Sequence, residues 1–173
     1  MLKNKLEKIA YRRLFKQLSL KSRSVNIYKL EEAKHIGIIW NQNDVNAANQ
    51  IQKIIQQLKR PNCFIHTYSY TNNPININGS SVQNVVVTPK QIKWTGAPKS
   101  SEAIEFINTS FDVLIDLSIQ HNLPITYALA MNNSRFKITS NCHHYEVADF
   151  FIQSPNKGIL EIFTSMKEYI DKF

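Results

Sequence analysis

The feature that most constrains this chain is a regular alternation of short apolar runs with longer segments of helical spacing. β-Branched and aromatic residues concentrate in six runs, at residues 35–40, 63–68, 85–87, 111–117, 135–139 and 148–152. Helical segments separate or follow these runs, at residues 45–60, 101–108, 124–131 and 154–170. Strands that alternate with helices indicate a parallel sheet that is covered on both faces. The sequence therefore predicts an α/β fold, a Rossmann-like three-layer α/β/α sandwich whose mainly parallel sheet has five or six strands.

Length and composition are those of a globular chain with one main domain. Of the 173 residues, 43% are apolar and 20% are charged. The four glycines are scattered, which excludes the glycine-rich phosphate loops, and no cofactor is expected. The longest apolar run, residues 36–40, is too short for a membrane span or a signal-peptide core. Two cysteines are too few for a disulfide framework, so we expect a reduced, cytoplasmic setting.

Positive charge is concentrated at the amino terminus. Residues 1–24 hold eight Lys or Arg side chains against the single acid Glu7, whereas the other 149 residues hold 13 basic and 12 acidic side chains. Residues 2–18 contain no Gly or Pro and are rich in Leu, Lys and Arg, which predicts a helix. A linker follows this helix. We therefore divide the chain into a basic helix with its linker, 1–34, and a Rossmann-like α/β domain, 35–173.

The basic residues of this helix form a stripe. At about 100° per residue, Lys5, Lys8, Arg12 and Lys16 fall within an arc of roughly 80°. A charge distribution of this kind favours an anionic partner, either nucleic acid or a membrane surface. The first hypothesis is a non-catalytic binding module that docks on RNA or a ribonucleoprotein through Lys5, Lys8, Arg12, Arg13 and Lys16.

Two other interpretations of the same helix stay open. The helix can pack on the body through Leu6, Leu14 and Leu18, with its charged stripe only a solvated face. It can also hold the protein on a membrane surface, although its apolar side lacks Trp and no lipidation signal follows Met1-Leu2. The sequence leaves the oligomeric state open.

Polar residues follow the first and the fourth predicted strand, where a Rossmann-like sheet binds its ligands. The candidates are Asp44 after the first strand, and Asp116, Ser118 and His121 after the fourth. A Ser, a His and two Asp at one crevice can act as nucleophile and base. Against this, Asn43 or Asp44 is also expected to cap the next helix, and no Gly-x-Ser-x-Gly elbow surrounds Ser118. A small enzyme or a domain that binds a small-molecule ligand is the alternative hypothesis, and we expect binding rather than catalysis.

The Cys and His residues lack the spacing of metal ligands. Cys142, His143 and His144 are adjacent, and Cys63 and His66 point to opposite faces of a strand, so no metal is expected.

Aromatic and basic residues elsewhere carry weaker indications. Trp94, Tyr68 and Tyr70 can stack on bases, but no ribonucleoprotein-type motif is present. Arg135 and Lys137 alternate with an aromatic residue, so they are predicted to share one face, the solvated side of an edge strand.

Four segments carry a resemblance to known families: Trp94-Thr95-Gly96-Ala97-Pro98-Lys99-Ser100, Phe111-Asp112-Val113-Leu114-Ile115-Asp116-Leu117, Tyr127-Ala128-Leu129-Ala130 and Ser134-Arg135-Phe136-Lys137-Ile138. Together they resemble an uncharacterised family of bacterial α/β proteins of about this length, for which no activity is assigned. Residues 111–138 are also similar to the amino-terminal half of heptosyltransferase-like glycosyltransferases. Thr139 stands where that family has Gly, and its second, nucleotide-sugar-binding half has no counterpart in the sequence. This second resemblance therefore implies the fold more than the reaction.

Overall fold

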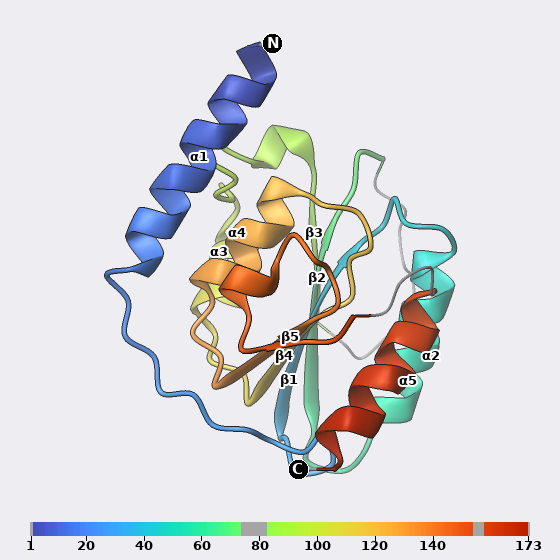
Figure 1. Ribbon diagram of the computed structural model, residues 1–173. Coiled ribbons are helices and arrows are strands. Elements are labelled where there is room, and N and C mark those ends of the chain that lie inside the picture. Colours follow the sequence, from blue (N-terminus) through green and yellow to red (C-terminus); the bar gives the residue numbers. More distant parts are fainter. Residues whose placement is uncertain (1, 74–82, 154–157, 173) are drawn as a thin grey trace.

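A computed structural model describes residues 2–73, 83–153 and 158–172, in which six strands form one sheet (Figure 1). The strands are β1 (His35–Asn41), β2 (Phe64–Tyr70), β3 (Gln83–Val87), β4 (Val113–Asp116), β5 (Phe136–Thr139) and β6 (Phe150–Phe151). Their order is β3-β2-β1-β4-β5-β6, and every neighbouring pair is parallel. The α/β fold with a parallel sheet, predicted from the alternating runs, is confirmed.

Helices cover both faces of the sheet and complete the three predicted layers. The helices α2 (Ala47–Leu58) and α5 (Ile159–Ile170) lie together on one face, whereas α1 (Leu2–Leu18), α3 (Ser101–Asn108) and α4 (Leu123–Met131) lie on the other (Figure 1). The helix that follows β1 and the helix that follows β4 are thus on opposite faces. The carboxyl ends of these two neighbouring strands flank the topological switch point, where ligands bind in such folds.

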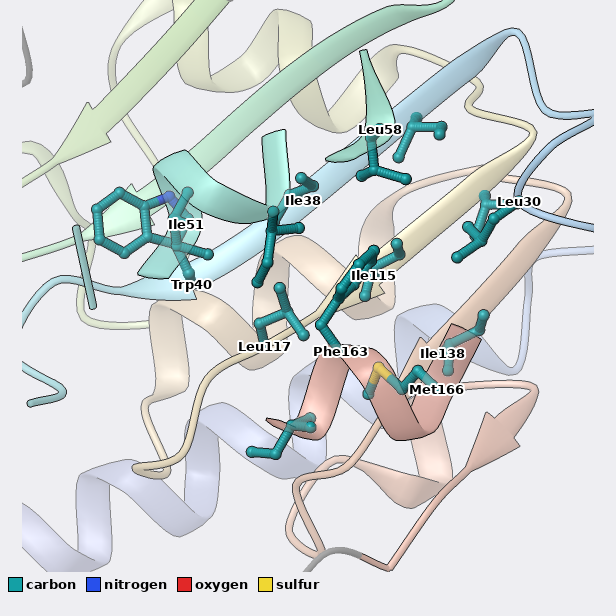
Figure 2. Packing of buried hydrophobic residues seen from close by; sticks show 14 of the residues in the cluster. Leu30, Ile38, Trp40, Ile51, Leu58, Ile115, Leu117, Ile138, Phe163 and Met166 are labelled. Carbon is teal, nitrogen blue, oxygen red and sulfur yellow. The ribbon is translucent and has the colours of Figure 1, made fainter. Parts of the chain in front are cut away.

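One buried cluster fills the space between the sheet and α2 and α5 (Figure 2). Ile38 and Trp40 of β1 and Ile115 of β4 are completely buried and share this cluster with Ile51 of α2 and Phe163 of α5. Burial of one such side chain contributes about 1.5–3 kcal/mol relative to its exposed state. Because helices cover both faces of the central strands, β1 is a continuous apolar run rather than an alternating one.

The second cluster lies on the other face and includes Leu14 of α1, Ile39 and Leu114. Gly37 borders it, and a Cβ atom at this position would lie 2.6 Å from Leu114 Cδ1 and 2.7 Å from Phe111 Cδ2. The ring of Phe111 and the Leu114 side chain therefore occupy the space that any larger residue at Gly37 would need.

Some boundaries differ from the predicted ones. The run at 148–152 forms only the two-residue strand β6, which has a single neighbour, and short edge strands limit unwanted pairing. The strand β2 continues to Tyr70 instead of ending at residue 68. The predicted start of the last helix at residue 154 lies outside the described residues, and α5 begins at Ile159.

The segment between α1 and β1 follows the surface of the body. The backbone N–H of Asn26 donates to the carbonyl of Arg135 at 3.1 Å, and Leu30 and Ala33 are buried. The segment thus runs from the face of the sheet that α1 covers to the amino end of β1 (Figure 1). The division of the chain after residue 34 stays a prediction. In the described part of the chain, no helix combines the length and the apolar character that a membrane crossing needs.

Candidate functional site

At the carboxyl end of β4, the Asp116 carboxylate is completely buried and surrounded by hydrogen-bond donors. Ser118 donates its backbone N–H at 3.0 Å and its hydroxyl at 2.6 Å, and Thr139 donates its hydroxyl at 2.8 Å. The Nδ1 atom of His144 lies 2.6 Å from the same carboxylate. Burial alone raises the pKa of Asp116, but His144 and the hydrogen bonds outweigh it and hold that pKa below its ordinary value. The carboxylate is therefore ionised at neutral pH.

His144 connects this carboxylate to α4. The ring is completely buried, and its Nε2 atom lies 2.9 Å from Thr126 Oγ1, a hydroxyl that is also 3.0 Å from the carbonyl of Asn122. The order carboxylate, histidine and hydroxyl is that of a catalytic triad, but the Thr126 hydroxyl donates its one proton to the Asn122 carbonyl rather than to His144. Our sequence reasoning considered His144 only as a metal ligand. It missed the contact with Asp116 because 28 positions separate the two residues and no local pattern links them.

The network continues through Tyr11 of α1 to the surface. The Tyr11 hydroxyl lies 3.4 Å from Thr126 Oγ1 and 2.5 Å from His121 Nε2, and the centroids of the Tyr11 and His121 rings are 5.5 Å apart. Burial raises the pKa of Tyr11 to about 12. Burial, together with the nearby rings of His144 and His143, lowers the pKa of His121 to about 4. His121 is therefore neutral at pH 7 and accepts a hydrogen bond from Tyr11, which ties α1 to the β4–α4 loop.

Asp44 bridges the ends of β1 and β4. Its carboxylate accepts hydrogen bonds from the backbone N–H of Ile119 at 2.9 Å and of Gln120 at 3.3 Å. Burial raises the pKa of Asp44, and these two hydrogen bonds oppose that rise. The prediction that Asn43 or Asp44 caps the next helix is wrong, because the N-cap of α2 is Asn46, in a left-handed conformation with φ of 54°. Asp44 instead holds the β4–α4 loop.

The structure thus brings the four predicted crevice residues into one neighbourhood, but the network there is closed. Asp116 and Ser118 are at most 1% exposed and Asp44 is 5% exposed. The Ser118 hydroxyl donates to Asp116 instead of to a histidine base. In this conformation the network positions α1 and the β4–α4 loop, and it leaves Asp44, Asp116 and Ser118 almost without contact with solvent. A catalytic role of Asp44, Asp116, Ser118 and His121 stays a prediction.

Helix α1 packs on the body by one face. Ala10 and Leu14 are 1% exposed, and Phe15 and Leu18 are partly buried against the second cluster. Leu6 is 46% exposed, so the expectation that it packs together with Leu14 and Leu18 is wrong. The buried face is centred about 100° further round the helix than Leu6.

The basic stripe lies on the opposite face of α1. Four of its residues are exposed, namely Lys5, Lys8, Arg12 and Lys16. Within the described ranges, the ion pairs of the protein involve other side chains, so these four charges are not neutralised by its own carboxylates. The stripe therefore faces solvent with its charge intact.

Arg13 extends this basic face toward the body. Its guanidinium carbon lies 4.8 Å from the centroid of the Trp94 ring, which is 51% exposed. A groove of about 250 Å³ separates this part of α1 from Lys93, Thr95 and Tyr127. Arg13, as a further basic residue, and the accessible ring of Trp94 thus lie beside the stripe. Tyr68, which we also considered for stacking on bases, is completely buried and cannot do so in this conformation.

The prediction that Arg135 and Lys137 share a solvated face of an edge strand is wrong. β5 lies between β4 and β6, so it is not an edge strand. Arg135 is exposed and donates to the Tyr28 hydroxyl at 2.5 Å, whereas Lys137 is 2% exposed and its amine donates to the carbonyl of Ala130 at 3.0 Å. Lys137 is buried because the segment after α1 and the end of α4 cover this part of the strand.

Three histidine rings gather beside the polar network, since the His121 ring centroid lies 4.8 Å from that of His143 and 5.4 Å from that of His144. Among the residues with described positions, no three His, Cys, Asp or Glu side chains are arranged to hold a metal ion. Cys63 and Cys142 are both free thiols.

These features define a Rossmann-like α/β protein with a docked basic amino-terminal helix and a closed polar network at the switch point. The chain belongs to DUF6913, a family of unknown function, whose model matches residues 3–173. No curated protein and no solved structure gives a significant match to the chain. The resemblance to an uncharacterised family is therefore confirmed, whereas the similarity of residues 111–138 to glycosyltransferases stays a prediction.

Proposed function

We propose that this protein is a non-catalytic module that binds RNA, alone or within a ribonucleoprotein, through the outward face of α1. The contact residues are Lys5, Lys8, Arg12, Arg13 and Lys16. The observation that supports this proposal is that α1 is docked by its apolar face while its basic stripe stays exposed and forms no ion pair with any residue whose position is described. Basic residues on a docked helix bind a polyanion at a lower cost in conformational entropy than those of a free arm, because their backbone is already ordered before binding.

The dimensions and surroundings of the stripe suit a nucleic-acid strand. Lys5 and Lys16 are eleven positions apart, which is about 16 Å along a helix and room for several phosphate contacts. Each neutralised phosphate of a single strand adds about 0.7 to the salt dependence of the binding constant. The exposed Trp94 ring beside Arg13 offers a surface on which a base can stack.

A membrane surface is the competing partner for the same helix. A helix that lies in the bilayer interface buries a broad apolar face in the lipid. In α1 the apolar residues Ala10 and Leu14 are already buried against the body, and among the side chains with a described position the large apolar residues exposed on the outward face are Leu6 and Ile9. The outward face therefore offers charge rather than apolar area, which favours RNA.

The test measures binding of the full chain to a labelled single-stranded RNA of about 20 nucleotides, by fluorescence anisotropy, from about 50 to 300 mM salt. The test variant combines Lys5→Gln, Arg12→Gln and Lys16→Gln. The control variant removes the same charge from exposed sites at the α2 and α5 side of the molecule, by Lys53→Gln, Lys59→Gln and Lys167→Gln. We expect the test variant to bind at least tenfold more weakly, with a salt slope smaller by about 2, and the control to bind like the wild type.

Three outcomes contradict the proposal: no RNA binding at low salt, equal weakening by both variants, or binding that ignores added salt. Flotation with phosphatidylserine vesicles is measured in parallel. Vesicle binding without RNA binding assigns α1 to a membrane surface.

A second candidate is a ligand-binding or transferase-like function at the switch point. The observation that favours it is the gathering of Asp44, Asp116 and Ser118 beside His144, at the place where Rossmann-like folds bind ligands. The similarity of residues 111–138 to heptosyltransferase-like proteins covers only their amino-terminal half and not the nucleotide-sugar-binding half, so UDP-glucose serves here as a probe of the switch point itself, where Rossmann-like folds hold nucleotides. Thermal unfolding with and without UDP-glucose tests it: a rise in Tm that is lost in Asp44→Asn supports this function, and an unchanged Tm contradicts it.

We also propose a cytoplasmic location. The two free cysteines support a reducing compartment. Fractionation of cells that produce the full chain would show it in the soluble fraction, and recovery from an oxidising compartment would contradict this assignment.

A further inference from the structure

A cavity of about 500 Å³ lies between the end of α1, the segment that follows it, the end of α4 and β5. In Figure 1 the segment after α1 leaves the helix beside α4, and Lys21 in that segment donates its amine to the carbonyl of Met131 at 2.6 Å. Phe15, Leu18 and Val147 give the cavity an apolar wall. The volume is within the range of sites for small molecules, roughly 300–1,000 Å³.

Three cationic side chains line this cavity together with two carboxylates: Lys21, Arg23, Lys137, Glu146 and Asp149. Arg23 and Asp149 neutralise each other in a two-pronged ion pair. The Glu146 carboxylate accepts a hydrogen bond from a tyrosine hydroxyl at 2.9 Å. The two lysines therefore outnumber the carboxylate that remains, and the cavity carries an excess of positive charge when both are protonated.

Lys137 is the buried group of this set. Its side chain enters the cavity wall from β5 at 2% exposure, and the carbonyl of Ala130 is the one hydrogen-bond partner of its amine among the described residues. A lysine amine in its charged form has three N–H donors. Burial, and then the charges of Arg23 and Lys21, lower the pKa of Lys137 to about 7, against the opposite effect of Asp149. An incoming anion would use the spare donors and favour the charged amine.

We propose that this cavity binds a small organic anion, with a carboxylate or phosphate group held by the buried Lys137 and the exposed Lys21. The carbon part of the ligand would contact the wall formed by Phe15, Leu18 and Val147. This site is separate from the RNA-binding face of α1. Because residues of α1 and of the segment after it form part of the wall, a bound anion also holds α1 in its docked position.

The contact of Lys137 with the end of α4 suggests that this lysine serves only to cap the helix, but capping does not require a buried lysine. The exposed Lys21 already donates to the last turn of α4, at Met131, without the cost of full burial. Lys137 makes an equivalent contact to Ala130 from a position where its charge is strongly disfavoured. A buried lysine with spare donors that lines a cavity is the arrangement found in sites that take anions or use the amine.

The test is an NMR titration of the isotope-labelled full chain with inorganic phosphate and, separately, with succinate, each up to about 50 mM. Because succinate is largely a dianion at both about pH 6.5 and about pH 9, a change in its affinity between them reports the lysines of the protein. We expect shifts of the amides of residues 130–137 and 145–149, and an affinity at least tenfold lower at the higher pH. The phosphate and succinate arms show which oxyanion is preferred.

Variants complete the experiment. Lys137→Met should abolish the shifts, Lys21→Met should weaken binding several-fold, and Lys53→Met on the exposed face of α2 should leave it unchanged. If Lys137→Met does not fold, Lys21→Met and the pH dependence decide the outcome. The proposal is overturned if neither anion causes shifts at the cavity, or if binding is the same in Lys21→Met and Lys137→Met as in the wild type.

Discussion

Replacement of Lys137 by Met should change how the stability of the protein depends on pH. In the folded state the pKa of Lys137 is about 7, because the side chain is buried, whereas the ordinary pKa of a lysine, which applies to the unfolded chain, is 10.5. The unfolded chain therefore binds more protons than the folded chain between pH 7 and pH 10.5, and the contribution of Lys137 to stability rises with pH across this window. One pKa unit corresponds to 1.36 kcal/mol, so the expected gain between pH 8 and pH 10 is about 2.5 kcal/mol.

The assay is urea unfolding of the wild type and of Lys137→Met at several pH values, followed by the fluorescence of the buried Trp40. The quantity of interest is the difference between the two free energies of unfolding, in which the titration of other groups cancels. We expect this difference to rise by about 2.5 kcal/mol from pH 8 to pH 10 in favour of the wild type. Lys53→Met controls for the loss of an exposed lysine. A difference that stays constant with pH would refute the buried, perturbed state of Lys137.

Further predictions concern the polar network and the docking of α1. The pKa of His121 is about 4 in the folded state and 6.5 in the unfolded state, so its contribution to stability is complete above pH 6.5 and is lost as the pH falls toward 4. Between pH 7 and pH 5 the free energy of unfolding, measured with urea, should therefore fall less in His121→Gln than in the wild type. His144→Ala removes one hydrogen-bond donor from the buried carboxylate of Asp116 and should cost about 1.5–3 kcal/mol at pH 7 by chemical unfolding; a cost below about 0.5 kcal/mol would contradict this contact. Leu14→Ala should cost about 2–5 kcal/mol by the same assay. Leu6→Ala, at an exposed site of the same helix, should cost less than about 0.5 kcal/mol, and equal costs would contradict the docking geometry.

Local patterns identified most of the fold. The run from Phe111 to Leu117 predicted a buried central strand, and β4 occupies its middle, because a strand with both faces covered needs apolar residues at nearly every position. The absence of Gly and Pro from residues 2–18 predicted α1 with its observed bounds. Edges were less predictable, since β6 has one neighbour and keeps only two residues of its run.

The candidate sites were predictable to different degrees. The stripe of basic residues on α1 follows from helical geometry alone, and the structure places it on the exposed face. Which apolar residues face the body does not follow, because it depends on the surface of α4, and Leu6 was assigned to the wrong face. The sequence also placed Asp116 and Ser118 after the fourth strand, but no local pattern indicated that Asp44 accepts hydrogen bonds from the loop that follows Ser118.

The sequence by itself thus determined the alternation of strands and helices, and with it the parallel sheet and the separation of a basic helix from a nearly neutral body. These properties depend on neighbouring residues and on the periodicity of helices and strands, which a linear chain displays directly. Only the tertiary structure decided that His144 pairs with Asp116 and that Lys137 is buried beneath the segment after α1. Both facts depend on contacts between residues far apart in the chain, and the free energy of a charged group depends on what surrounds it in space rather than on its neighbours in sequence.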